Sequence, residues 1–130
     1  MTSATAPAPI LGAISSVRVW VADLARSRTF FAQVLGLEET SFGPIATFKA
    51  GPVTLVVEQP EPGQGDDHQA LIGRSIGVCF SAADAQGAYD ALRARGVVFL
   101  EPPEKQPWGG ILAHLSDPDG NIFTVVQMPA

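Results

Sequence analysis

Two kinds of hydrophobic spacing follow each other at the start of this chain. Between residues 14 and 21, valine occupies every second position from Val17 onward, which is the period of a β-strand with two unlike faces. Asp23 then has the side chain of a helix N-cap, apolar residues recur at helical spacing, and Gly36 supplies a residue that ends helices in the left-handed conformation. The pattern predicts a strand followed by a helix.

The same order returns in the second half of the chain. Residues 76–80 form an apolar strand pattern, Asp84 is the next candidate helix N-cap, and Gly96 is the next glycine expected to end a helix. Asp84 follows Asp23 by 61 residues, and Gly96 follows Gly36 by 60 residues. A match of this kind is the signature of an internal repeat.

Each half also contains a predicted hairpin. In the first half, strand-like runs at 45–49 and 53–58 flank Ala50-Gly51-Pro52. In the second half, runs at 111–115 and 122–127 flank a turn at 117–121, where aspartate, proline and glycine suit consecutive turn positions.

The hairpins complete the repeat. Residues 53–60 precede the similar residues 122–129 by 69 positions, and an insertion of about nine residues around 102–107 accounts for the larger shift. The sequence therefore predicts an α+β fold made of two βαβββ modules. Each module alone leaves a sheet face uncovered, so the two must pair, either in one chain or across a homodimer.

Composition limits the classes of protein to which this chain can belong. With 130 residues, 46% hydrophobic and 16% charged, it can form a packed globular domain. No apolar run approaches the roughly 20 residues that span a membrane. The net charge of −5 and the scattered basic residues argue against nucleic acid as a partner. The single cysteine and the lack of a signal-peptide pattern lead us to expect a cytoplasmic protein.

Breaker-rich segments set the expected boundaries. Residues 1–13 are predicted to be a flexible tail, and residues 14–130 a single domain. Within that domain we expect module one at about 14–60, a linker at about 61–74 and module two at about 75–129.

Four short motifs resemble one known family. They are Val21-Ala22-Asp23-Leu24, the helix pattern from Arg26 to Leu37, Pro107-Trp108-Gly109, and Asp117 to Asn121. Together they resemble the vicinal oxygen chelate superfamily of glyoxalase I, bleomycin-resistance proteins and extradiol dioxygenases. The resemblance covers roughly residues 14–128 and implies the glyoxalase/bleomycin-resistance fold, a mixed β-sheet curved into a cup. It is specific for the fold and says little about the chemistry.

The resemblance also implies four positions for a divalent metal, and here they lack ligands. The family's usual histidine and glutamate ligands fall on Ser16, on Val56 or Leu55, on Gly77 and on Thr124. Divalent metals prefer imidazole, carboxylate or thiolate groups, and these residues supply none. We therefore expect no bound metal and no cofactor.

Strand alternation from those positions predicts what remains in the cup. The expected pocket is mainly apolar, with tryptophan walls and three polar points. Its predicted ligand-binding residues are Arg18, Trp20, Glu58, Cys79, Trp108, Leu112 and His114.

Several of these residues allow two interpretations. Arg18 either holds a ligand or pairs with an acidic residue, and His114 is either a structural histidine or a proton-transfer group. Trp108 is either a lid over the cup or a packing anchor. Cys79 is most simply a small apolar filler.

Two functions from different classes follow. The first is a metal-free protein that sequesters a small aromatic or cationic molecule by stacking on tryptophan, and it is the preferred hypothesis. The alternative is a metal-independent isomerase or lyase in which Arg18 steadies an anionic group and His114 is the general acid or base.

Overall fold

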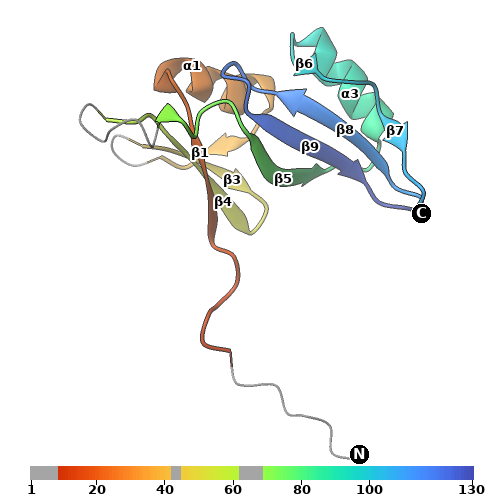
Figure 1. The fold of residues 1–130 in the computed structure, drawn as a ribbon, viewed down its shortest axis with the longest axis horizontal. Coiled ribbons are helices and arrows are strands. Elements are labelled where there is room, and N and C mark those ends of the chain that lie inside the picture. The colour runs from red at the N-terminus through yellow and green to blue at the C-terminus, as the bar shows by residue number, and fades with distance from the viewer. Residues whose placement is uncertain (1–8, 42–44, 62–68) are drawn as a thin grey trace, which may run out of the picture.

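The first half of the chain forms one mixed sheet. The protein is seen here as a computed structural model that describes residues 9–41, 45–61 and 69–130. In spatial order the strands are β1 (Ser16–Trp20), β4 (Val53–Glu58), β3 (Ala46–Ala50) and β2 (Glu38–Glu39). The strand β1 runs parallel to β4, and the other neighbours are antiparallel (Figure 1).

The second half repeats this plan in a second sheet. Its first strand again runs parallel to its last, and the remaining pairs are antiparallel. The order is β5 (Ser75–Ser81), β9 (Ile122–Gln127), β8 (Ile111–Ser116) and β6 (Val98–Phe99), with β7 (Glu104–Lys105) also on β8. The predicted α+β fold of two βαβββ modules is confirmed. Among the described residues the two sheets share no ladder, so the expected single cupped sheet consists of two mixed sheets.

The predicted helix boundaries are also confirmed. The Asp23 carboxylate accepts the N–H of Arg26 at 3.1 Å, at the start of α1 (Leu24–Arg28). The Asp84 carboxylate accepts the N–H of Gly87 at 3.0 Å, at the start of α3 (Ala85–Ala94). Gly36 and Gly96 follow the helices with φ of 79° and 90°.

The first helix differs from the expected regular spiral. After α1 it continues as the π-helix η1 (Thr29–Val34), in which the N–H of Leu35 donates to the carbonyl of Phe30 at 2.9 Å. The wider turn lets both Phe30 and Phe31 point into the core, with exposures of 8% and 0%.

One hydrophobic core joins the two modules. The ring of Phe31 lies 5.7 Å from that of Phe48 in the first module and 5.7 Å from that of Phe123 in the second. Leu55 and Leu115, one from each sheet, belong to the same buried cluster. The modules therefore pack against each other within one chain, with the helices on one side of the sheets (Figure 1).

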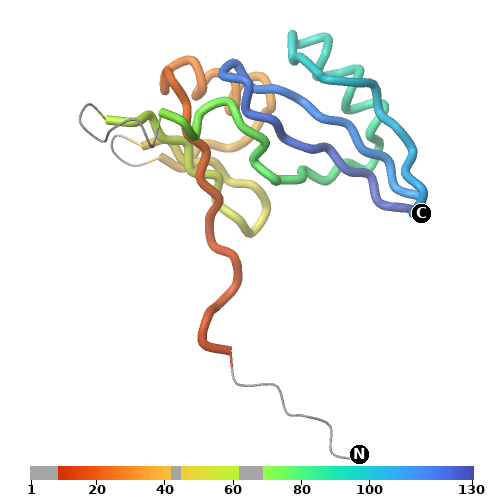
Figure 2. The backbone as a smooth tube through the Cα atoms, viewed as in Figure 1, coloured from red at the N-terminus to blue at the C-terminus, as the bar shows by residue number. Residues whose placement is uncertain are grey.

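The structure describes only parts of the predicted N-terminal tail and of the predicted linker. Residues 9–15 run away from the sheets (Figure 2), and Ile10 and Leu11 are 96% and 86% exposed. Residues 1–8 of the predicted tail and 62–68 of the predicted linker lie outside the described residues. No helix in the described ranges is long and apolar enough to cross a membrane.

Candidate functional site

The sheet face away from the core holds the family's metal positions. Leu55 is 2% exposed and packs in the core, whereas its neighbour Val56 pairs with Arg18 of β1 and shares its face. The second of the four positions is therefore Val56, and Leu55 is excluded. On this face Ser16, Val56, Gly77 and Thr124 offer no imidazole or carboxylate, so these four positions do not fit a divalent metal.

The alignment of the two modules explains why Val56, and not Leu55, is the equivalent of Thr124. The Gln59 side-chain oxygen accepts the N–H of Leu24 at 3.0 Å, and the Gln127 oxygen accepts the N–H of Ala85 at 2.8 Å. Each glutamine thus satisfies the first N–H of its own module's helix. Gln127 follows Gln59 by 68 residues, so the shift of 69 expected from sequence similarity is wrong by one.

The first sheet gathers three of the predicted ligand-binding residues. Arg18 Nε lies 3.0 Å from Glu58 Oε1, with the side chains 59% and 19% exposed. The Arg18 guanidinium carbon lies 5.9 Å from the centroid of the Trp20 ring. Both interpretations of Arg18 remain compatible with this geometry, because the acidic partner lies in the same chain and beside the same indole.

Arg18 and Trp20 also line a pocket of about 240 Å³ between the modules. Its opposite wall comes from the segment that leads into β5, part of which was expected to be linker. The lining residues are Arg18, Trp20, Leu71, Arg74, Ser75 and Ile76.

The second sheet gathers three more predicted residues. His114 pairs with Thr124, which pairs with Cys79, so these side chains share a row across β8, β9 and β5. Leu112 lies two residues before His114 on the same strand and face. Cys79 lines a separate pocket of about 530 Å³ next to the β3–β4 hairpin.

The sequence did not reveal the partner of His114. Its Nδ1 lies 2.5 Å from Oε1 of Glu101, and the two side chains are 37% and 38% exposed. A carboxylate on one ring nitrogen fixes the orientation of an imidazole and leaves the other nitrogen for chemistry. Glu101 lies between β6 and β7, where no hydrophobic period marks which face a side chain occupies.

Gly77 interrupts the alternation that was used to place Cys79. Gly77 has a φ of 76°, and the pairing of β5 with β9 shifts register between Ser75 and Cys79. Counting in twos from Gly77 is therefore not valid. Cys79 lies on the expected face because it pairs with Thr124.

Trp108 stands apart from both clusters. It is 52% exposed, and its ring lies over Gly110, where an added Cβ would come within 1.9 Å of a ring carbon. Such exposure disfavours a role as a core anchor. Trp108 is not among the residues that line the Trp20 pocket. The seven predicted residues thus form two clusters and one separate tryptophan in this chain.

The turn at 117–121 makes long-range contacts with residues that line the Trp20 pocket. Asp119 accepts the N–H of Ala22 at 3.2 Å and forms an ion pair with Arg26 at 2.5 Å. Asn121, which is fully buried, donates to the carbonyl of Trp20 at 3.0 Å and accepts the N–H of Arg74 at 3.2 Å. The turn therefore ties both walls of the pocket together.

Asp117 organises this turn from within. Its carboxylate accepts the N–H groups of Asp119 and Asn121 at 2.9 and 2.8 Å, and the Asn121 side-chain amide at 2.9 Å. Burial raises the pKa of Asp117, and these hydrogen bonds oppose the shift. The predicted hairpin turn is confirmed, and its role between the modules is an addition.

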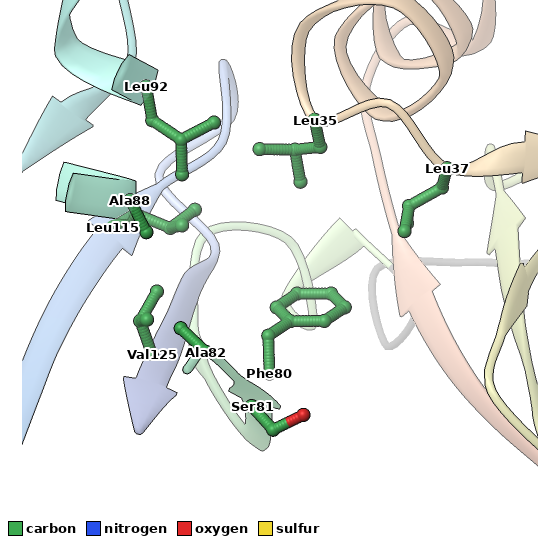
Figure 3. Close-up of a pocket in the computed structure, with 9 residues that line it drawn as sticks. All are labelled: Leu35, Leu37, Phe80, Ser81, Ala82, Ala88, Leu92, Leu115 and Val125. Carbon is green, nitrogen blue, oxygen red and sulfur yellow. The ribbon is translucent and has the colours of Figure 1, made fainter. Parts of the chain in front are cut away.

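An apolar pocket of about 210 Å³ lies on the helix side of the sheets. Figure 3 shows Leu35 and Leu37 of the first module facing Ala88 and Leu92 of α3, while the hydroxyl of Ser81 points away. None of the predicted ligand-binding residues lines it, and it offers space but no polar chemistry.

Within the described ranges, no three histidine, cysteine, aspartate or glutamate side chains are grouped in a way that would hold a metal ion. His68 lies outside those ranges. What the site offers chemically is a guanidinium beside an indole on one sheet, and an imidazole held by a carboxylate on the other.

The fold and these motifs define a class of proteins. The family model described as the Glyoxalase/Bleomycin resistance protein/Dioxygenase superfamily matches residues 13–125. This chain belongs to that superfamily, as the sequence resemblance implied.

Several solved structures share the fold. A member from Sphaerobacter thermophilus DSM 20745 is 26% identical, with a TM-score of 0.78 over 92% of this chain and 100% of that one. TnmS3, an antibiotic binding protein from Streptomyces sp. CB03234, is 23% identical, with a TM-score of 0.76 over 95% and 100%. Lactoylglutathione lyase from Agrobacterium tumefaciens is also 23% identical, with a TM-score of 0.72 over 90% and 94%. The fold is thus common to a binding protein and an enzyme.

Proposed function

We propose that this protein binds a small aromatic molecule, without a resident metal, at the pocket between β1 and the start of β5. The observation that carries the proposal is the pairing of Trp20 with Arg18 at the wall of a pocket of about 240 Å³. An indole offers a flat apolar surface, and the neighbouring guanidinium fixes the orientation of a ligand.

Two further points support binding. The metal positions are occupied by Ser16, Val56, Gly77 and Thr124, which removes the chemistry that a metal would supply. TnmS3, which has the same fold, is described as an antibiotic binding protein.

We also propose that the protein acts as a homodimer. The Arg18 pocket contains none of Cys79, Leu112 and His114, although all were expected in one cup. A second chain that covers the open sheet faces would complete the cup and shield edge strands. Light scattering at tens of micromolar tests this, and a 13.6 kDa species would exclude it.

The binding experiment uses the two tryptophans as reporters. We expect a thermal-shift screen of small aromatic compounds to yield a ligand that changes tryptophan fluorescence. Trp20→Ala should then weaken binding several-fold to about tenfold, since an aromatic pair contributes about 0.5–1.5 kcal/mol. Full affinity in Trp20→Ala would exclude this pocket.

Trp108→Ala is the companion variant. Because Trp108 is 52% exposed, its loss should leave the melting temperature of the free protein nearly unchanged. A weaker ligand affinity in this variant would show that Trp108 closes over the ligand, as the sequence suggested. A strong fall in melting temperature would make it a packing anchor.

One observation favours an enzyme as the second candidate. The Glu101 carboxylate lies 2.5 Å from His114 Nδ1, an arrangement that orients a histidine for proton transfer. If a metal-independent isomerase or lyase uses it, a bound compound should be converted on incubation, and His114→Ala should stop the conversion. Recovery of the compound unchanged by mass spectrometry would exclude this candidate and leave binding.

A further inference from the structure

Two of the eight basic residues of this acidic protein line the same small pocket. The chain carries a net charge of −5, yet Arg18 of β1 and Arg74, just before β5, both border the pocket that holds Trp20. Two guanidinium groups in one pocket of about 240 Å³ repel each other unless an anion or a carboxylate lies between them.

The charges around the pocket are only partly balanced. Oε1 of Glu58 lies 3.0 Å from Nε of Arg18, so within the described part of the chain Arg18 forms an ion pair with Glu58. Arg74 takes part in none of the ion pairs found among the described residues. Among the described residues that line this pocket, Arg18 has an acidic partner in Glu58, and Arg74 provides a second guanidinium group.

The backbone of Arg74 is held in place. Its N–H donates to the side-chain oxygen of Asn121 at 3.2 Å, and its carbonyl accepts the N–H of Ile122 at 2.8 Å. Asn121 also binds the carbonyl of Trp20 at 3.0 Å. One buried side chain thus fixes the distance between the backbones that carry the indole and the second guanidinium, which is the preorganisation that a binding site needs.

We infer that this pocket binds flat aromatic carboxylates, with the ring on Trp20 and the carboxylate between Arg74 and Arg18. A guanidinium matches the geometry of a carboxylate with two parallel N–H donors, which an uncharged amide cannot use equally. This inference rests on the proposed function and makes it specific. It favours an anionic ligand, where the sequence led us to expect an aromatic or cationic one.

The test compares two compounds of the same shape, 2-naphthoate and 2-naphthamide. Titrations followed by tryptophan fluorescence and calorimetry should show at least tenfold tighter binding of the naphthoate, and added salt should reduce the difference. Arg74→Gln should reduce the preference to less than threefold, whereas Arg74→Lys should keep part of it. The matched control is Lys105→Gln, which removes the same charge from exposed β7 and should keep the full preference.

Each contrary result has a distinct meaning. Equal binding of both compounds would overturn the carboxylate inference and leave aromatic binding at Trp20 intact. A preference that survives in folded Arg74→Gln, as judged by its melting temperature, would also overturn it. If neither compound binds while the aromatic screen finds another ligand, the inferred ligand class is wrong and the proposed function stands.

Discussion

The last turn of the first module and the last turn of the second have different roles. The turn between β3 and β4 uses Gly51, with a φ of 62°, to reverse the chain. The turn between β8 and β9 also reverses the chain, but its Asp119 and Asn121 bind the end of β1, α1 and the segment before β5. Of the two equivalent turns, only the turn of the second module also connects the two modules through these contacts.

The open sheet faces differ in a similar way. The first module presents the guanidinium of Arg18 with the carboxylate of Glu58. The second presents the imidazole of His114 with the carboxylate of Glu101. The repeat conserves the positions of strands and caps, while each face carries its own chemistry.

Removal of Asn121 should give the largest effect, because its hydrogen bonds connect the two modules. Its side chain is fully buried and hydrogen-bonds to Gly73, Arg74, Trp20 and Asp117. Asn121→Ala leaves buried donors and acceptors without partners, so the free energy of unfolding should fall by about 3 kcal/mol or more.

Urea unfolding measures this loss. The control is Gln86→Ala, which removes an amide from the exposed surface of α3 and should change stability by less than about 0.5 kcal/mol. A loss below about 1 kcal/mol in Asn121→Ala would mean that the core alone joins the modules.

Gly77 gives a second, smaller contrast between the modules. An added Cβ at Gly77 would meet no atom within 4 Å, so only its φ of 76° opposes a side chain. Gly77→Ala should therefore cost about 1–2 kcal/mol. Ser16 is its counterpart in the first module, 61 residues earlier, and Ser16→Ala should be nearly neutral because Ser16 is exposed. Equal thermal shifts for the two variants would show that β5 adapts without strain.

The sequence predicted features whose causes are local. Asp23 and Asp84 cap helices because a short carboxylate reaches an N–H three residues away, and Gly36 ends a helix because it tolerates positive φ. These contacts need no knowledge of the other module, so residue type and spacing were sufficient.

The remaining features depend on contacts between distant segments. Leu55 and Val56 are both apolar, so hydrophobicity alone did not say which faces the core, and the repeat register was misjudged by one residue. Glu101 meets His114 only because β8 lies beside the β6–β7 segment. Arg74 reaches the Trp20 pocket through Asn121, a contact between residues 47 positions apart.

The smallest expected effect concerns the apolar pocket between the modules on the helix side. Ala88 lines the apolar pocket of about 210 Å³ between α3 and the segment after η1 (Figure 3). Ala88→Leu adds three carbon groups there, and each buried methylene contributes about 0.8 kcal/mol before side-chain entropy and crowding are subtracted. We expect a net gain of about 1 kcal/mol, seen as a higher melting temperature.

Ala91→Leu on the same helix is the matched control. Ala91 is exposed, and alanine and leucine have similar helix propensity, so the change should be nearly neutral. A gain in Ala88→Leu alone would show that the two modules leave usable space on the helix side, while the turn with Asn121 holds them together near the sheet edge. A loss in Ala88→Leu would mean that Leu35 and Leu92 already close this space in solution, and the modules would then be joined as tightly by packing as by the turn.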